Sequence, residues 1–279
     1  MKRVICFGAG GTAERLYNSI SEKYEIVAFV DNQKSKHGTL FGKKVVAPER
    51  MREFDYDYIV ITSIIGVTTI LGQLADMGVD EAKVISSYVD YICTSRVEWL
   101  RSLSKLQIDI DKSIEVAEAG VFQGDFAKHI NHCYPDRRLH LFDTFEGFPD
   151  EDILEERQLS HAKTGEYSFT NEDIVISKME YPENIIIHKG YFPQTAKGIN
   201  SKFCLVNLDM DLFRPTLEGL RFFAPRMVKG GVILIHDYFD NAYEKSIQKA
   251  VKEFMDETEN TYLRLIPIGD AVSIAVVGF

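Results

Sequence analysis

Acidic side chains follow two apolar runs in the second half of the sequence. Asp209 and Asp211 come directly after the run FCLVNL, and His236 and Asp237 come directly after the run VILI. Such runs are typical of buried strands, and neighbouring parallel strands end at the same edge of their sheet. Sheets of this kind bind ligands at that edge. We therefore expect three carboxylates and one imidazole to converge beside a bound ligand.

Carboxylates held this close together need a positive partner. They repel one another and burial raises their pKa, whereas a divalent cation removes that penalty. Their oxygens suit Mg²⁺. A metal there can orient two neighbouring hydroxyls of a substrate and lower the pKa of one of them, and a further carboxylate can accept the proton. The alternative is that these acids cap helices or end solvated loops.

Two glycine-rich turns each follow an apolar run and precede a helical pattern. The first, GAGGTA, contains Gly8, Gly10 and Gly11, and Asp31 closes the next apolar run. Glycines let the main chain approach a phosphate at a helix N-terminus, and the carboxylate can accept hydrogen bonds from ribose hydroxyls. This pattern predicts a Rossmann-like fold with a nucleotide-binding turn. An NAD(P)-linked oxidoreductase is one alternative, but no Tyr-x-x-x-Lys constellation accompanies the turn.

The second turn, EAGVFQGD, is looser and contains Glu118, Gly120 and Gly124. Asp143 ends the next apolar run, in LFDTFEGFP. The two stretches resemble the first two motifs of class I S-adenosylmethionine-dependent methyltransferases. In those enzymes the glycines make room for the methionine part of the cofactor, and an acid after the second strand binds the ribose diol. The alternative is a plain strand–helix turn with a solvated aspartate.

Strand and helix patterns alternate over residues 1–90 and start again at residue 109. This alternation predicts an α/β protein with two doubly wound domains, 1–90 and 109–279. Residues 91–108 have Val97, Leu100 and Leu103 at helical spacing, which predicts a helical connector or a part of either domain. The segment 261–279 predicts two strands about a Gly-Asp turn, so that the second sheet ends in a β-hairpin.

A long polar stretch, residues 147–183, interrupts the second domain. It contains His161, Tyr167 and Phe169 among many acidic residues. It lies where a methyltransferase fold often has a substrate lid, which would exclude water from the reaction. A surface loop is the alternative.

The composition of the chain argues against nucleic-acid-binding and membrane-spanning proteins. The chain has 279 residues, of which 45% are hydrophobic, and a formal net charge of -10. An acidic chain is poorly suited to bind nucleic acid. The four cysteines have no metal-binding spacing, and no run is long enough to span a membrane. We expect a cytoplasmic protein with reduced thiols.

Residues 115–255 resemble the macrocin O-methyltransferase family, whose members methylate sugar hydroxyls of antibiotics. The similar stretches are EAGVFQGDFAKHI, LHLFDTFEGFP, HKGYFPQT and, most specifically, residues 206–238. The resemblance implies that Asp209 and Asp237 are metal ligands and that Asp211 is the general base. It also implies that Lys189 and Gly190 border the adenine or the substrate.

His236 departs from the pattern of that family, because many relatives have an aspartate there. Imidazole is a poorer ligand for Mg²⁺ than carboxylate and favours softer metals. His236 is therefore either a third ligand of Mg²⁺ or another divalent metal, or a proton acceptor, since imidazole titrates near neutral pH.

The N-terminal half resembles a small Rossmann-like domain of bacterial sugar-modifying enzymes, through FGAGGTAERL, VAFVDNQKSKHGTLFGKKVVAPE and DYIVITS. In sugar acetyltransferases a similar domain binds a nucleotide-sugar, and elsewhere it is an accessory unit. The two resemblances together imply an S-adenosylmethionine-dependent O-methyltransferase that acts on a sugar hydroxyl of a nucleotide-sugar or glycan and forms a homo-oligomer. The alternative is a nucleotide-sugar-binding accessory protein whose methyltransferase fold is inactive.

Overall fold

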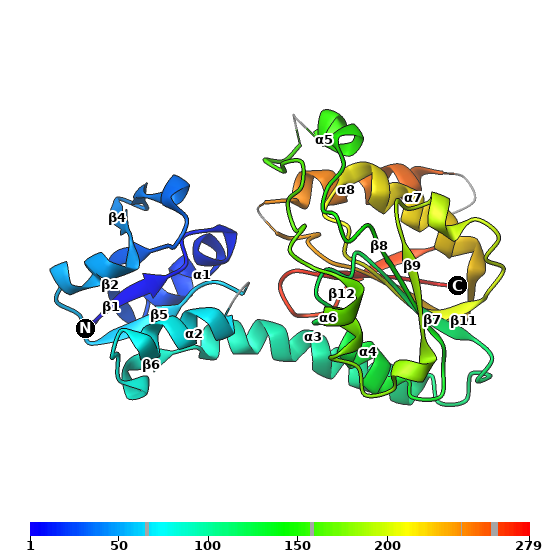
Figure 1. Ribbon diagram of the computed structural model, residues 1–279, viewed down its shortest axis with the longest axis horizontal. Coiled ribbons are helices and arrows are strands. Elements are labelled where there is room, and N and C mark those ends of the chain that lie inside the picture. The colour runs from blue at the N-terminus through cyan, green and yellow to red at the C-terminus, as the bar shows by residue number, and fades with distance from the viewer. Residues whose placement is uncertain (65–66, 157–158, 241, 258–261) are drawn as a thin grey trace. The chain divides into compact units, whose positions relative to one another are not determined.

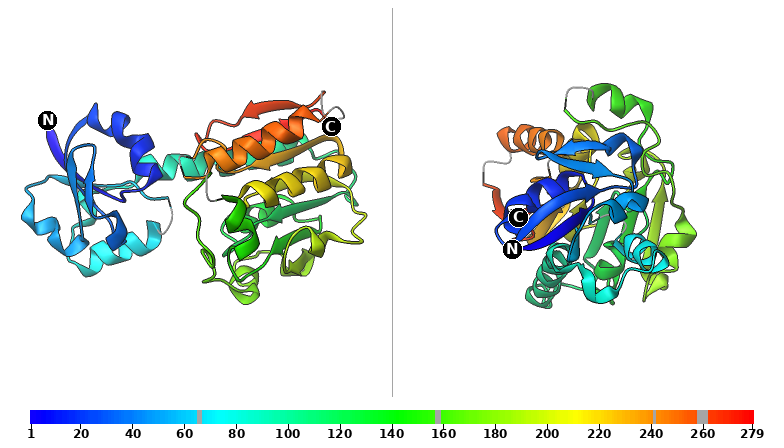
Figure 2. Two further views of the ribbon diagram at one scale, coloured as in Figure 1. Left: turned by 90° about the horizontal axis from the view of Figure 1, so that it is seen from above. Right: turned by 90° about the vertical axis from the view of Figure 1, so that its left-hand side faces the viewer.

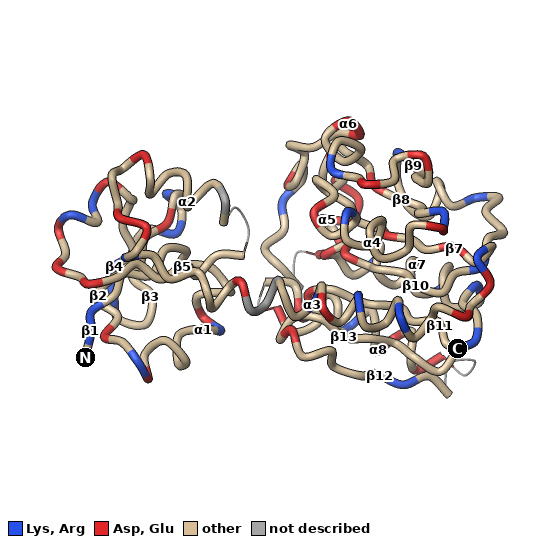
Figure 3. Tube along the Cα trace, turned by 90° about the horizontal axis from the view of Figure 1, so that it is seen from below, with Lys and Arg blue, Asp and Glu red and all other residues tan. Residues whose placement is uncertain are grey.

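The computed structural model describes residues 1–64, 67–156, 159–240, 242–257 and 262–279. They form two compact units, unit 1 from Met1 to Thr94 and unit 2 from Ser95 to Phe279 (Figure 1). Each unit has its own sheet and its own buried core. Figure 3 shows basic and acidic residues along the traces of both units, so the negative charge is not confined to one of them.

Unit 1 is a six-stranded sheet covered by helices on both faces. The strand order is β3-β4-β2-β1-β5-β6, and among the described residues of this unit only β3 and β4 pair antiparallel. Neighbouring residues of a strand point to opposite faces, so that Val4 and Cys6 pack with α1 whereas Ile5 and Phe7 pack with α2. The elements are β1 (Lys2–Phe7), α1 (Gly11–Ser21), β2 (Tyr24–Val30), η1 (Lys34–Lys36), β3 (Gly38–Leu40), β4 (Lys43–Val46), η2 (Pro48–Glu53), β5 (Tyr58–Ile61), α2 (Val67–Asp76), η3 (Glu81–Lys83) and β6 (Val84–Ile85).

One helix, α3 (Ser87–Leu106), runs from unit 1 into unit 2. It begins earlier than the connector expected at residues 91–108, and the boundary between the units falls inside it. Val89 is buried in the core of unit 1, and Leu100 is buried in the core of unit 2. Within the described residues, no helix combines the length and the apolar character that crossing a bilayer requires.

Unit 2 is a seven-stranded sheet in the order β12-β13-β11-β10-β7-β8-β9. The strands from β11 to β9 in this order are parallel, and β13 and β12 close the chain as the antiparallel hairpin that the sequence predicts. Figure 2 shows the helices of this unit outside its sheet. The elements are β7 (Glu115–Ala119), α4 (Ala127–Cys133), β8 (Leu139–Asp143), α5 (Asp150–Glu156), α6 (Glu172–Ile176), η4 (Pro182–Asn184), β9 (Ile185–Lys189), η5 (Gln194–Ala196), β10 (Phe203–Leu208), α7 (Phe213–Phe223), η6 (Ala224–Arg226), β11 (Met227–Ile235), α8 (Glu244–Asp256), β12 (Arg264–Pro267) and β13 (Ile274–Val277).

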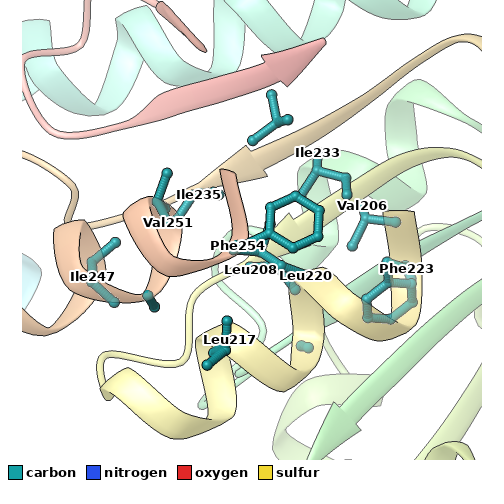
Figure 4. Close-up of a cluster of buried hydrophobic side chains, with 14 of the residues drawn as sticks. Val206, Leu208, Leu217, Leu220, Phe223, Ile233, Ile235, Ile247, Val251 and Phe254 are labelled. Carbon is teal, nitrogen blue, oxygen red and sulfur yellow. The ribbon is translucent and has the colours of Figure 1, made fainter. Parts of the chain in front are cut away.

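The strands β10 and β11 lie at the centre of the larger core of unit 2. Their inward side chains meet the apolar faces of α7 and α8, where burial of each large side chain contributes about 1.5–3 kcal/mol (Figure 4). The other face of the sheet packs against α3 and α4. Because both faces are covered, the ends of these strands are fixed relative to one another. The labelled core residues are Val206, Leu208, Leu217, Leu220, Phe223, Ile233, Ile235, Ile247, Val251 and Phe254.

A pair of hydrogen-bonded histidines with nearly parallel rings is built into the same sheet. His140 on β8 and His188 on β9 have ring centroids 5.0 Å apart, and His140 Nε2 lies 2.7 Å from Glu115 Oε2. Because the ionised carboxylate only accepts, His140 donates Nε2–H to it and accepts at Nδ1 from His188 Nε2–H, 2.8 Å away. Burial lowers the pKa of His140 despite Glu115, and burial and His140 lower the pKa of His188 to about 4.

We expect the free energy of unfolding to decrease as the pH falls from about 6.5, the usual pKa of histidine, towards 4. In this window the unfolded chain binds protons that the folded chain does not. Urea denaturation at several pH values should give a shallower decrease for His188→Gln, which keeps an N–H donor but does not titrate. The exposed His161 is the matched control, and His161→Gln should behave as the wild type. Identical profiles for all three proteins would contradict the expectation.

Candidate active site

The register of three strands brings the predicted acidic residues together. Leu208 pairs with Ala119 on one side and with Ile235 on the other. The next residue, Asp209, donates its N–H to Ala119 O at 2.8 Å, and His236 donates its N–H to Leu208 O at 2.9 Å. The ends of β10 and β11 are therefore neighbours, as the sequence predicts, and the end of β10 also lies beside the glycine turn that follows β7.

The glycine turn touches the acidic strand end directly. Gly120 has φ +82°, and a Cβ at this position would lie only 1.8 Å from Asp209 O. Gly124 has φ +76°, and its Cβ would lie 3.0 Å from a methyl group of Val175 on α6. Gly120 is thus required both by its backbone conformation and by the approach of a neighbouring strand.

Asp143 holds this turn in place from the end of β8. Its Oδ2 accepts the N–H groups of Val121 and Phe122 at 2.7 and 2.8 Å, and its Oδ1 accepts the N–H of Phe145 at 2.7 Å. Phe122 and Phe145 both have positive φ, at 48° and 56°. Such strain in non-glycine residues persists only where the surroundings hold it. The aspartate therefore has a structural role whether or not it also binds a ligand.

Three of the predicted residues present donor atoms to one point. Atoms of Asp209, His236 and Asp237 all lie within 4.8 Å of one another. His236 Nδ1 is 3.0 Å from Asp209 Oδ1 and 3.0 Å from Asp237 Oδ2. Neither oxygen is aligned for a hydrogen bond, so that Nδ1 is buried without a hydrogen-bond partner among the described residues. Donor atoms that face a common point in this way are arranged as metal ligands are.

The charges of these side chains are strongly coupled. Burial and Arg96 lower the pKa of His236, but the carboxylates of Asp209 and Asp237 outweigh them and raise it to about 10. Burial raises the pKa of Asp209, but His236 and Arg96 outweigh it and lower the pKa below its usual value. Burial and the charge of Asp237 raise the pKa of Asp211 well above its usual value. Asp211 is thus a partly buried carboxyl group with raised proton affinity.

Arg96 on α3 is a site residue that the sequence analysis missed. Its guanidinium donates to Asn207 Oδ1 at 2.8 Å and to Asp209 Oδ2 at 3.2 Å, and it lies 3.8 Å from the ring centre of Phe126. Asn207 in turn donates to Glu118 Oε1 at 2.7 Å. Asn207 is the one uncharged polar residue in a fully buried strand, and a buried amide requires partners. The need of the buried Asn207 amide for hydrogen-bond partners could therefore have indicated that a polar residue such as Arg96 lies beside it.

Glu118 lies deep behind the glycine turn. Its side chain is buried, and Oε2 has no hydrogen-bond partner among the described residues. Burial, together with the charge of Asp209, raises the pKa of Glu118 to about 8. The hydrogen-bond chain from Glu118 through Asn207 and Arg96 to Asp209 connects the glycine turn to the acidic strand end.

The stretch expected to form a lid packs over the glycine turn. Tyr167 contacts the rings of Phe122 and Phe148 at 5.4 and 5.3 Å, and its hydroxyl is 3.5 Å from that of Tyr243. Burial and the charge of Asp211 raise the pKa of Tyr167, so its hydroxyl stays protonated. Residues 157–158 of the stretch lie outside the described part of the chain, and His161 is exposed.

Helix α5 anchors this stretch through two buried carboxylates. Asp152 accepts the hydroxyl of Tyr191 at 2.6 Å. Glu156 accepts the N–H of Phe213 at the start of α7 and the hydroxyl of Ser246 on α8, both at 2.5 Å. The sequence analysis counted these residues only among the acids of a polar stretch.

Lys189 and Gly190 lie at the end of β9, on the far side of Asp143. Lys189 is exposed and pairs with Glu172 on α6 at 2.9 Å. Gly190 donates its N–H to Asp143 O at 2.9 Å. These two residues therefore border the end of β8, which separates them from the glycine turn and from the acidic strand end.

The predicted nucleotide-binding turn of unit 1 is also closely packed. Gly8 has φ +115°, and its Cβ would lie 2.7 Å from the main chain of Thr62. Asp31 Oδ2 accepts the N–H of Ala9 at 2.9 Å and lies 3.4 Å from Lys36 Nζ. The Lys36 amine would also lie 3.2 Å from a Cβ on Gly10, and Gly11 begins α1. Asp31 is thus tied to its own turn.

The close approach at Gly120 can be tested against a matched glycine. We expect Gly120→Ala to lower the free energy of unfolding of unit 2 by about 3 kcal/mol or more, because the methyl group meets main-chain atoms. Gly198 has φ +85° but open space around its Cβ, so Gly198→Ala should cost about 1–2 kcal/mol. Urea denaturation followed by fluorescence of Trp99, the single tryptophan, measures both. Equal losses of unfolding free energy in the two variants would show that the approach of Gly120 to Asp209 does not determine the cost of the methyl group.

The contribution of Arg96 can be compared with that of Arg101 on the same helix. Arg96→Met should lower the free energy of unfolding by about 1.5–3 kcal/mol, because Asn207 and Asp209 lose charged hydrogen-bond partners. Arg101 is exposed and pairs with Glu98, so Arg101→Met should cost about 0–1 kcal/mol. The same Trp99 fluorescence reports both changes. A loss for Arg96→Met no larger than that for Arg101→Met would contradict this assignment.

Comparison with known proteins agrees with this geometry. The sequence model described as "Macrocin-O-methyltransferase (TylF)" matches residues 91–266, and the model "C2185-like, N-terminal" matches residues 1–85. A curated relative from Streptomyces olivaceus is named 8-demethyl-8-(2,3-dimethoxy-alpha-L-rhamnosyl)-tetracenomycin-C 4'-O-methyltransferase. It is 24% identical over 167 residues, which are 53% of this chain and 64% of the relative's length.

Two solved structures share the fold. The O-methyltransferase NovP has a TM-score of 0.52 at 20% identity, over 65% of this chain and 78% of that one. The calicheamicin methyltransferase CalS11 has a TM-score of 0.51 at 17% identity, over 77% of this chain and 86% of that one. The family model covers more than half of the sequence, including every residue of the acidic strand ends. The chain belongs to the macrocin O-methyltransferase family.

Proposed function

We propose that this protein transfers a methyl group from S-adenosylmethionine to a sugar hydroxyl of a nucleotide-sugar or a glycan. One observation carries the proposal: the glycine turn at Gly120 lies in direct contact with the strand end that bears Asp209. A donor bound at the turn and an acceptor bound at the acids would then be neighbours. Family membership and the name of the Streptomyces olivaceus relative support a sugar hydroxyl as the acceptor.

The turn suits S-adenosylmethionine, which when bound supplies an electrophilic methyl group on a sulfonium ion. Gly120 and Gly124 have no side chains, so no side chain of their own covers the main chain of the turn at these two positions. Asp143 uses both acceptor positions of Oδ2 and one of Oδ1, so one position on Oδ1 remains for a ribose hydroxyl. Glu118, behind the turn, and Lys189 and Gly190, next to Asp143, would complete the cofactor side.

The acidic strand ends suit a divalent metal, which when bound lowers the pKa of a hydroxyl in contact with it. Asp209, His236 and Asp237 would hold the metal, because their donor atoms already face one point. Their charges fit a dication as well. Asp209, Asp211 and Asp237 carry three negative charges when ionised, and Arg96 offsets one of them.

Asp211 is the proposed general base. Its raised pKa favours acceptance of a proton, and its charge is coupled to those of Asp237 and Tyr167. The hydroxyl oxygen of the sugar would bond to the methyl carbon as the carbon–sulfur bond breaks towards sulfur, and Asp211 would receive the hydroxyl proton. We assign His236 to the metal and not to this proton, because Nδ1 faces two carboxylates. The aromatic contacts of Tyr167 would keep water away.

We further propose that unit 1 binds the nucleotide part of a sugar donor or acceptor near Gly8, Gly10, Gly11 and Asp31, or serves as an accessory unit. A redox role is less favoured, because no Tyr-x-x-x-Lys constellation accompanies the glycine turn of unit 1. Cytoplasmic location and a homo-oligomeric state remain proposals. Cys6, Cys133 and Cys204 are free thiols, which agrees with a reducing compartment.

Mass spectrometry can test the transfer after incubation with S-adenosylmethionine, Mg²⁺ or Mn²⁺, and a panel of nucleotide-sugars. The acceptor should gain the mass of one CH₂ group. Asp211→Asn should lower the rate by about 10²–10⁴-fold through loss of the base. Asp136 is the matched control, since it is exposed at the opposite edge of the sheet, and Asp136→Asn should retain the wild-type rate.

Calorimetric titration with S-adenosylmethionine separates the proposal from the accessory-protein alternative. An active enzyme should release or absorb heat on binding at millimolar cofactor or below. No binding at that concentration would favour a methyltransferase fold without activity, with nucleotide-sugar binding as its remaining role.

A further inference from the structure

The donor atoms at the acidic strand ends are two oxygens and one nitrogen. We propose that His236 makes this site select a first-row transition-metal dication, such as Mn²⁺ or Co²⁺, over Mg²⁺. This inference rests on the metal site of the proposed function. It concerns only which ion the chain holds, and it does not depend on methyl transfer.

The backbone directs His236 and Asp237 to the same point. Consecutive residues of a strand normally point to opposite faces of the sheet. Asp237 has φ +57°, a left-handed conformation that costs a non-glycine residue about 1–2 kcal/mol. This turn lets its Oδ2 come within 3.0 Å of the preceding imidazole. Backbone strain of this kind often marks a functional site. Here it indicates that the side chains of His236 and Asp237 are both required at the same point.

The imidazole nitrogen faces one oxygen of each of the two aspartates that would share a metal with it. His236 Nδ1 is equidistant from Asp209 Oδ1 and Asp237 Oδ2, yet it is aligned with neither. Asp209 Oδ2 already accepts a hydrogen bond from Arg96. The chain therefore offers one oxygen from each aspartate and one nitrogen from the histidine.

This donor set discriminates against Mg²⁺ for two reasons. Mg²⁺ is a hard cation that takes oxygen ligands, whereas imidazole suits transition metals. A neutral imidazole also supplies no charge, and Arg96 beside Asp209 weakens the attraction for any cation held mainly by charge. The bond to the imidazole nitrogen adds binding free energy for a transition metal and so offsets the weaker electrostatic attraction. For Mg²⁺ this bond adds little.

Metal binding to the metal-free full chain tests the inference by calorimetry, without cofactor or sugar. The wild type should bind Mn²⁺ at least about 100-fold more tightly than Mg²⁺. In His236→Asp the ratio should fall by about tenfold or more, because Mg²⁺ gains a third carboxylate. Bound Co²⁺ should show a visible absorption spectrum that differs between the two proteins.

The controls separate a change of ligand from a general loss of structure. His188→Gln, at the distant histidine pair, should keep the wild-type ratio. His236→Gln gives a second folded variant if the third carboxylate in His236→Asp destabilises the chain, and it should bind Mn²⁺ more weakly. An unchanged ratio in His236→Asp, wild-type Mn²⁺ affinity in His236→Gln, or equal wild-type affinities for Mg²⁺ and Mn²⁺ would overturn the inference. Selective Mn²⁺ binding without methyl transfer would support it while refuting the proposed function.

Discussion

The contact between the Gly120 main chain and Asp209 is the constraint on which the site depends. A side chain at Gly120 would collide with the carbonyl group of Asp209, so β7 and β10 can end side by side only at a glycine. Leu208 pairs with Ala119 and with Ile235, and this register sets both neighbours of Asp209. A slip of one residue would turn the side chain of Asp209 to the other face of the sheet.

Close placement of three carboxylates creates a charge problem that Arg96 and His236 partly solve. Arg96 is held by Asn207 and by the ring of Phe126. Its side chain is therefore already ordered beside Asp209, and the ion pair costs little further conformational entropy. His236 carries a proton between two carboxylates, which raise its pKa to about 10. A metal would take over that charge and release the proton, since a ligating imidazole must be neutral. Without an ion, the chain thus compensates its acidic site with the charges of Arg96 and His236.

Strand patterns predicted the sheets well because local hydrophobicity determines which runs are buried. The run FCLVNL is fully buried, and the acids that follow it do meet those that follow VILI. Arg96 and the Tyr167 contacts could not be predicted in this way. Arg96 is 111 residues from Asn207 in the sequence, and its neighbours indicate only an amphipathic helix. The connector began earlier than expected, at Ser87, because Val89 has an apolar partner in unit 1.

The two units have the same kind of glycine turn, but the residue that the neighbouring strand places beside the turn differs. Gly8 and Gly120 both follow the first strand of a sheet, and an aspartate after the second strand accepts the next N–H in each case. Thr62 in unit 1 has the place of Asp209 in unit 2, since each donates its N–H to the residue before the glycine. Thr62 uses its hydroxyl to bind Gly8 O, whereas Asp209 directs a carboxylate towards His236. The glycine turns are therefore alike in the two units, whereas the residue after the adjacent strand supplies a hydroxyl in unit 1 and a carboxylate in unit 2.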